Sequence, residues 1–459
     1  MPPCAICREN LIANAWRASL SIQLLVTVIL IRIERSPPDS GQGNPYNLVE
    51  SRFVDASAIQ AGKVVIFMEG SAPIGQAESG FRRHKTRVVE VGGVGIGGEN
   101  PVRVQSMTTP DTYQVAEVVE QIHRLEEAGC ELVRVTVPKA EDAAALSEIK
   151  KQIRIPLICD IHFDHKMALQ AMDHPVDKIR INPGNIGGMD KFRQVVRKAR
   201  DRGLPMRIGV NAGSLEKDLV EKYGYPCPPA MVESALRYIE IAESEGYHAM
   251  IVSLKSSDTL TAIESYRLYA KQADYPTHIG ITEAGKPPYA IVKSACGLAP
   301  LLVDGIGDTM RISLLGDPVP EIAAAYDILQ ATRRRVRRPE LIACPTCGRL
   351  EIDLEGIIAQ VEKRLAGKRT PVKISILGCV VNGPGEAREA DLGIAAGKGK
   401  GVIFKRGEIV RHVKEEEMVE ALMEEVAKWE EEEAQKGNLG AEKRVESGGN
   451  HRVRLPMSR

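Results

Sequence analysis

The chain has 459 residues, 43% of them hydrophobic, which is long enough for two or three domains with packed cores. Lysine plus arginine and aspartate plus glutamate both number 61, so no overall basic field recommends nucleic acid or a membrane as the partner. Nine cysteines, an odd number, indicate a reducing, cytoplasmic setting rather than a disulfide framework.

Residues 1–82 differ in character from the rest of the chain. The apolar run Ala18–Ile31 is shorter than the roughly 20 residues that a membrane-spanning helix needs, and no convincing cleavage site for a signal peptide follows it. Residues 36–47 are rich in Pro, Ser, Gly and Asn, which is typical of a linker. We therefore expect residues 1–82 to be a largely disordered or non-native extension, and the native protein to begin at or near Met68.

A glycine-rich run, Gly92–Gly98, separates two apolar segments, Lys85–Val91 and Pro101–Gln105. Its glycines match the G-x-G-x-x-G pattern of dinucleotide-binding proteins. That pattern requires a helix directly after the glycines, to hold the pyrophosphate at its N-terminus, whereas the residues that follow here are typical of a strand. We therefore predict a β-hairpin.

From there the pattern alternates between short Val- and Ile-rich strands and segments with helical periodicity. The predicted strands lie at about 102–106, 132–137, 156–161, 177–182, 206–211, 249–254, 277–282 and 309–313. The predicted helices are Val115–Ala128, Glu141–Ile153, His165–Met172, Asp190–Arg202, Ala230–Glu245, Thr259–Ala273, Tyr289–Val303 and Glu321–Arg333. Eight strands, each followed by a helix, predict an α/β fold, a (β/α)8 TIM barrel over residues 83–335.

Polar residues gather where these strands end, which is where such barrels bind substrates. They include Arg134, Asp160, His162, Arg180, Asn182, Arg207, Asn211, Lys255, Glu283, Arg311 and Ser313. Any one of them could be an exposed side chain or half of an internal salt bridge. Together, however, Arg180, Arg207 and Lys255 bring cations into a small volume, and such a cluster is suited to phosphate oxygens. Asp160, His162 and Glu283 are available there for proton transfer.

A second, smaller α+β domain is predicted over residues 336–433, after a basic connector that we interpret as a solvated linker. Its predicted elements are an amphipathic segment at Glu351–Leu365, strands at Val372–Leu377, Gly401–Phe404 and Glu408–Val413, and an acidic helix at Glu415–Glu433. The polar tail over residues 434–459 is predicted to be disordered.

This domain contains Cys344 and Cys347 in a CxxC motif and Cys379 in a glycine-rich loop. A redox dithiol needs no third cysteine, and structural zinc usually has a second CxxC or CxxH pair. An iron-sulfur cube can have three thiolate ligands and an oxygen ligand on its fourth iron, and Glu386 is the nearest carboxylate that could serve. The spacing favours a cluster and leaves zinc open.

From Arg83 to about Glu433 the sequence resembles the bacterial 4-hydroxy-3-methylbut-2-enyl diphosphate synthases of the methylerythritol phosphate isoprenoid pathway, in their two-domain form without the plant-type insertion. The resemblance rests on Val104–Met107, Asp160–Asp164, Arg180–Asn185, Arg207–Lys217, Gly280–Gly285, Asp304–Thr309, Ala343–Cys347 and Gly378–Glu386.

The resemblance implies a reaction, a cofactor and partners. The barrel would bind 2-C-methyl-D-erythritol 2,4-cyclodiphosphate, and two electrons from reduced flavodoxin or ferredoxin would open its ring and remove a hydroxyl. The implied ligands of a 4Fe-4S cluster are Cys344, Cys347, Cys379 and a replaceable Glu386. Glu283 would deliver a proton to the leaving oxygen. A head-to-tail homodimer would bring the cluster of one subunit to the barrel of the other.

Two other interpretations stay open. One is a phosphate-binding barrel enzyme of the aldolase or pterin-binding type with a structural zinc domain. The other is a non-catalytic iron-sulfur regulator, which the neutral net charge and the crowded barrel rim count against.

Overall fold

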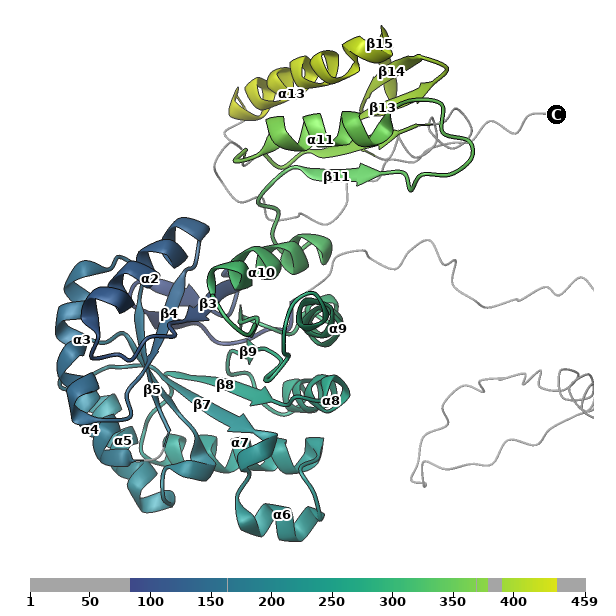
Figure 1. Cartoon of the computed structure of the whole chain (residues 1–459). Coiled ribbons are helices and arrows are strands. Elements are labelled where there is room, and N and C mark those ends of the chain that lie inside the picture. The colour runs from purple at the N-terminus through teal and green to yellow at the C-terminus, as the bar shows by residue number, and fades with distance from the viewer. Residues whose placement is uncertain (1–82, 163, 369, 379–389, 436–459) are drawn as a thin grey trace, which may run out of the picture. The chain divides into compact units, whose positions relative to one another are not determined.

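The computed structural model describes residues 83–162, 164–368, 370–378 and 390–435. The extension predicted over residues 1–82 lies outside the described residues, and so does the tail except for Ala434 and Gln435, which belong to the last helix. The described chain forms two bodies with separate cores, one around an eight-stranded sheet and one around a five-stranded sheet (Figure 1).

The first body is a parallel barrel, as predicted. Its strands are β3 (Arg103–Met107), β4 (Leu132–Thr136), β5 (Leu157–Ile161), β6 (Lys178–Ile181), β7 (Met206–Asn211), β8 (Met250–Lys255), β9 (His278–Ile279) and β10 (Thr309–Met310). In the sheet they run in the order β8-β7-β6-β5-β4-β3-β10-β9. An isolated parallel bridge between Val252 and Thr277 joins β8 to the segment that leads into β9. The sheet therefore closes nearly completely into a cylinder.

Helices surround the strands (Figure 1). They are α2 (Val115–Ala128), α3 (Ala140–Gln152), α4 (His165–Ala171), α5 (Met189–Asp201), α6 (Lys217–Tyr223), α7 (Pro228–Ser244), α8 (Thr259–Ala270), α9 (Tyr289–Val303) and α10 (Val319–Ala331). In α2 the buried residues Val118, Ile122 and Leu125 follow helical spacing and pack in the core between helices and strands. The predicted helices are confirmed, and α6 is a short addition after β7.

The predicted hairpin exists, but its second strand was placed wrongly. β1 (Val89–Val91) pairs with β2 (Val94–Ile96), which lies inside the glycine-rich run, whereas Pro101–Gln105 mostly belongs to barrel strand β3. Gly92 and Gly93 both have positive φ, as a two-residue hairpin turn requires, so the chain reverses earlier than we predicted. The hairpin closes the N-terminal end of the barrel with an apolar cluster of Val89, Val91, Ile96, Leu132, Ile158 and Ile251.

The second body is a mixed sheet covered by two helices. Its strands are β11 (Glu340–Ala343), β12 (Lys373–Leu377), β13 (Leu392–Gly397), β14 (Lys400–Lys405) and β15 (Glu408–Lys414). The first three are parallel, and β13, β14 and β15 are antiparallel neighbours. Helices α11 (Leu354–Leu365) and α13 (Met418–Gln435) pack on each other and share one core with the sheet.

Strands β11 and β13 were not predicted. β11 is short and half-exposed, and β13 has the sequence LGIAAG, in which small residues weaken the strand signal. None of the helices in the described ranges is both long and apolar enough to cross a membrane.

Candidate active site

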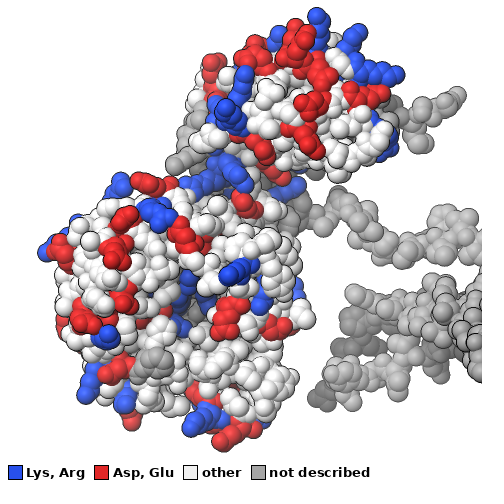
Figure 2. All heavy atoms as spheres, viewed as in Figure 1, with Lys and Arg blue, Asp and Glu red and all other residues white. Residues whose placement is uncertain are grey.

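The ends of the barrel strands bring the predicted polar residues into one region. Neighbouring parallel strands pair Asp160 of β5 with Arg180 of β6, and Arg180 with Arg207 of β7. The intervening residues Ile179, Ile181 and Ile208 belong to the core beneath the helices, so the three charged residues face the interior of the barrel. Lysine and arginine atoms are visible inside a hollow of the barrel body in Figure 2.

Asp160 lies at the centre of this charge cluster. It is 1% exposed, and its carboxylate accepts from Arg180 Nη1 at 2.8 Å and lies 3.3 Å from Arg134 Nε. His162 Nε2 is 3.7 Å from the same carboxylate. Burial alone would raise the pKa of Asp160, but the charges of Arg134, Arg180, His162 and Arg207 outweigh it and lower the pKa far below its ordinary value. Asp160 is therefore a fixed anion that holds the arginines in place.

The other cations have less compensation. Burial, followed by the charges of Arg134 and Arg180, lowers the pKa of Arg207 well below its ordinary value, and Nε and Nη1 of Arg207 have no partner among the described residues. Lys255 is 7% exposed, and burial and the neighbouring arginines lower its pKa in the same way. Burial also lowers the pKa of Arg134 to about 10. Such a cluster favours a bound anion.

Arg311 has a partner that the sequence interpretation missed. Glu321, near the start of α10, is 1% exposed, forms an ion pair with Arg311 at 3.2 Å and accepts from Ser106 Oγ at 2.8 Å. Met107 Sδ accepts from Arg134 at 2.9 Å and from Arg311 at 3.4 Å, and so joins the two guanidinium groups. The sequence did offer a signal for Glu321, because it is an acidic residue in the first turn of a helix that follows a polar strand end.

The remaining predicted barrel residues also lie near the strand ends. Asn182 is buried and donates to Ser214 Oγ at 2.9 Å, and the carbonyl oxygen of Asn211, with its amide oriented to satisfy its neighbours, accepts from Arg180 at 3.3 Å. Ser313 is half-buried two residues after Arg311. His162 is half-buried, and burial lowers its pKa although Asp160 opposes the shift.

Glu283 is exposed on the loop after β9 and has an unusual backbone conformation. Its φ is 53°, in the left-handed region that non-glycine residues seldom adopt. The loop is fixed on both sides, since Thr282 N donates to Ser256 O at 3.2 Å and Leu315 N donates to Gly285 O at 3.0 Å. Strained backbone of this kind clusters at functional sites, which is consistent with a catalytic role for Glu283.

Cys344 and Cys347 follow the end of β11, beside the end of β12. Ala343 pairs with Ile376, and Cys344 N donates to Ile376 O at 3.3 Å, so the CxxC turn begins beside the segment that leads into Gly378. Cys344 is half-buried and Cys347 exposed. Hydrogen bonds from Arg349 lower the pKa of the Cys347 thiol, which favours the thiolate that metals bind.

The other two predicted cluster ligands, Cys379 and Glu386, lie outside the described residues. Within the described ranges no three His, Cys, Asp or Glu side chains form a group that could hold a metal ion. Two thiols three residues apart in one loop, one of them biased towards thiolate, are nevertheless a donor set that suits an iron-sulfur centre.

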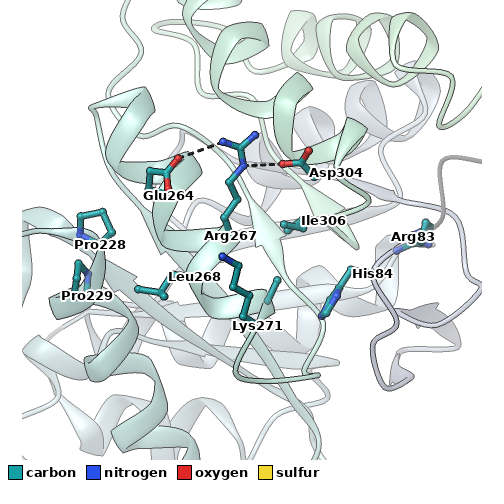
Figure 3. A pocket seen from close by; sticks show the side chains of 11 residues that line it. Arg83, His84, Pro228, Pro229, Glu264, Arg267, Leu268, Lys271, Asp304 and Ile306 are labelled. Atoms are coloured by element: carbon teal, nitrogen blue, oxygen red, sulfur yellow. Dashed lines mark hydrogen bonds and ion pairs between the residues drawn. The ribbon is translucent and has the colours of Figure 1, made fainter. Parts of the chain in front are cut away.

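A pocket of about 750 Å³ lies away from this region, beside α8 and the turn at Asp304 (Figure 3). None of the predicted site residues lines it. The arginine at its centre, Arg267, already donates to Asp304 at 2.7 Å and to Glu264 at 3.3 Å. We therefore place the candidate site at the strand ends and not in this pocket.

Comparison with known proteins identifies the family. The model of the GcpE TIM-barrel domain matches residues 86–326, and that of the GcpE C-terminal domain matches residues 340–428. The chain belongs to the GcpE family. A relative named 4-hydroxy-3-methylbut-2-en-1-yl diphosphate synthase (flavodoxin), from Thermodesulfovibrio yellowstonii, is 53% identical over 348 residues, which are 76% of this chain and 100% of that protein.

Two further relatives have the same printed name. The protein from Anoxybacillus flavithermus is 54% identical over 78% of this chain and 98% of its own length, and that from Geobacillus thermodenitrificans is 55% identical over 77% and 94%. The predicted resemblance is thus confirmed, and the chain is an oxidoreductase of the GcpE family. A solved dihydropteroate synthase from Stenotrophomonas maltophilia matches 54% of this chain and 97% of its own with a TM-score of 0.40 and 14% identity, a similarity too low to support a conclusion.

Proposed function

We propose that this GcpE-family enzyme converts 2-C-methyl-D-erythritol 2,4-cyclodiphosphate into 4-hydroxy-3-methylbut-2-enyl diphosphate. The observation that supports this most directly is the cluster of buried cations at the strand ends, which has Asp160 as its central counter-charge. A cyclic diphosphate supplies oxygen acceptors for Arg207, whose Nε and Nη1 have no partner among the described residues, and negative charge beside Lys255, which is surrounded by arginines. The names of the relatives point to the same product.

In this proposal the barrel residues bind and orient the diphosphate. Arg180, Arg207 and Lys255, with Asn211 and Ser313, hold its phosphate oxygens. The remaining predicted substrate-binding residues complete the binding site and keep those groups in position through the contacts described above; they are Arg134, Asp160, His162, Asn182 and Arg311. Glu283, on its fixed loop, gives a proton to the hydroxyl that leaves as water.

The ligands of a 4Fe-4S cluster in this proposal are Cys344, Cys347, Cys379 and Glu386. When bound, the cluster would pass electrons from the reduced donor to the substrate, two per turnover, as the ring opens and the hydroxyl departs. Cys344 and Cys347 are suited to this role because they lie three residues apart in the loop after β11, where hydrogen bonds from Arg349 favour the thiolate of Cys347. The printed name of the relatives makes flavodoxin the first candidate donor, with ferredoxin as the alternative.

We further propose that residues 83–335 and 336–433 are separate domains and that a cytoplasmic head-to-tail homodimer assembles the complete site. Several exposed apolar side chains lie on helix starts and loops that follow the barrel strands: Leu260, Tyr289, Val292 and Leu315. These residues occupy the end of the barrel that contains the cation cluster. They offer an apolar rim that the cluster domain of a second copy could cover.

Anaerobic reconstitution with iron and sulfide tests this proposal. We expect a brown protein that turns over the cyclic diphosphate with reduced flavodoxin. A colourless protein that binds zinc would favour the alternative of a barrel enzyme with a structural zinc domain, and a brown protein without turnover would favour a regulator. Activity in mixtures of Glu386→Ala and Arg207→Ala subunits would support the dimer, and its absence would indicate a site within one chain.

A further inference from the structure

A second group of polar side chains lies deeper in the barrel, and all of its members except Arg207 have no role in the proposed reaction. We call it the inner polar layer; it consists of Gln105, Lys178, Arg207, Ser253 and His278. Each of the five is at most 1% exposed. The neighbours of these residues along the strands, such as Val104, Ile179, Val252 and Ile279, pack in the core outside the barrel, so alternation directs the five side chains inward.

Lys178 is the unexpected member. It is the first residue of β6, two positions before Arg180 and thus one layer below it, and it pairs with Ile158 of the apolar cluster that closes the N-terminal end. It is fully buried, and its Nζ has no hydrogen-bond partner among the described residues. Burial, followed by the like charges of Arg207 and Arg134, lowers the pKa of Lys178 well below its ordinary value.

The rest of the layer also lacks partners. Both amide atoms of Gln105, Nε and Nη1 of Arg207, Ser253 Oγ and His278 Nε2 have no partner among the described residues, although His278 Nδ1 lies 2.6 Å from Thr309 Oγ1. Most of these atoms are donors, and buried donors without acceptors are costly. Water could satisfy some of these donors, but it cannot offset the repulsion between Arg207 and a protonated Lys178, which a bound anion would relieve.

We propose that the inner polar layer binds one anion beneath Arg180, held by Lys178 and by Arg207, which lies between this anion and the substrate phosphates. The anion is either a free inorganic ion or a phosphate oxygen of a ligand that reaches down from the strand ends. Both sources would bring a negatively charged hydrogen-bond acceptor to the same two side chains. The inference goes beyond the proposed reaction and does not depend on it, because inorganic anions can be tested without turnover.

The test compares Lys178→Met with the matched control Lys151→Met in the full-length protein. Lys151 is on α3 with a side chain 71% exposed, so both variants change the net charge equally. Thermal unfolding is followed in gluconate buffer of constant ionic strength, with added bromide, inorganic phosphate or pyrophosphate. A ligand that binds only the folded state raises the unfolding midpoint.

We expect anions to raise the unfolding midpoint of the unmodified protein and of Lys151→Met. Lys178→Met should unfold at a higher temperature than the unmodified protein without anions, because a buried amine without a partner is removed, and should lose at least tenfold in anion affinity. A response to bromide or phosphate would identify a free ion, and a response to pyrophosphate alone would identify a ligand phosphate. Equal anion responses in all three proteins, or none in the unmodified one, would overturn the proposal.

A second measurement decides the matter if Lys178→Met does not fold. Crystals of the unmodified protein soaked in bromide should show an anomalous peak within hydrogen-bonding reach of Lys178 Nζ. Crystals with pyrophosphate should show phosphate oxygens there if the anion belongs to a ligand. Electron density for water alone at that position in both crystals would refute the site.

Discussion

The two regions of this molecule that we assign to function are built in opposite ways. We call the end of the barrel where the strands finish the barrel mouth. Its charged side chains are buried and are fixed by ion pairs and by strand register, with Asp160 between Arg134 and Arg180. We call the edge of the small sheet where β11 ends the cysteine edge. There Cys347 is exposed, and the CxxC segment is joined to β12 through the backbone amide of Cys344. Changes at the mouth should therefore alter stability and activity together, whereas changes at the cysteine edge should alter cofactor binding and leave folding intact.

The largest expected effect is loss of the iron-sulfur cluster in the variant Cys347→Ser. The side chain is exposed, so the free energy of unfolding of the apoprotein should be almost unchanged. The iron content, the visible absorbance and the activity should all be lost, because serine is a poor ligand for cluster iron. The matched control is Cys296→Ser, which changes an exposed cysteine on α9 of the barrel and should retain all three. A brown, active Cys347→Ser protein would contradict the ligand assignment.

At the barrel mouth, Asp160→Asn should have the largest effect on stability. It leaves Arg134 and Arg180 buried without their shared counter-charge, a loss of about 3–5 kcal/mol in the free energy of unfolding. Because the folded-state pKa of Asp160 is lowered, its contribution should be complete above the unfolded pKa of about 4 and should fade as the pH falls below it. Urea unfolding from pH 7 to pH 3 measures the difference between the two proteins.

The control for this experiment is Asp190→Asn, which changes an exposed aspartate in the first turn of α5. It should change stability by no more than about 0.5 kcal/mol at any pH. If Asp160→Asn lowered the free energy of unfolding as little as this control does, the ion pairs at the mouth would be incidental to the fold.

The sequence predicted the barrel well because strand and helix periodicities are local signals. It placed the second hairpin strand wrongly, because the glycine-rich run contains both the turn after β1 and the short strand β2. The many glycines concealed that strand. Arg207 was found at a strand end, but Glu321 and Lys178 were missed, because their roles depend on what packs around them in three dimensions. The predictions for Cys379 and Glu386 remain predictions, because both lie outside the described residues.

An intermediate effect is expected for Glu321→Gln, which removes the charge that Arg311 pairs with. The free energy of unfolding should fall by about 1–3 kcal/mol, because a buried guanidinium loses its ionic partner while the amide retains part of the hydrogen bonding. Combining it with Arg311→Met tests the pair directly. The double variant should lose less than the sum of the single losses, by about 0.5–3 kcal/mol. Additive losses would show that the two residues do not act together.

The smallest expected effect concerns the backbone at the cysteine edge. The parallel strands β11, β12 and β13 end on the same side of the small sheet, so the β13–β14 turn at Lys398 and Gly399 lies on the side where the CxxC turn begins. Lys398 has φ 51°, which an L-residue adopts at a cost. Lys398→Gly should therefore raise the free energy of unfolding of this body, by less than about 1 kcal/mol.

The neighbouring glycine provides a control of opposite sign. Gly399 has φ 70°, and a Cβ added there would meet nothing within 4 Å, so Gly399→Ala tests backbone strain alone and should lower the free energy of unfolding by about 1 kcal/mol. Hydrogen exchange of the β13 and β14 amides should follow both changes, while the barrel amides and the iron content stay constant. If Lys398→Gly lowered stability instead, the lysine side chain would be contributing a contact, and the cysteine edge would depend on side chains as the barrel mouth does.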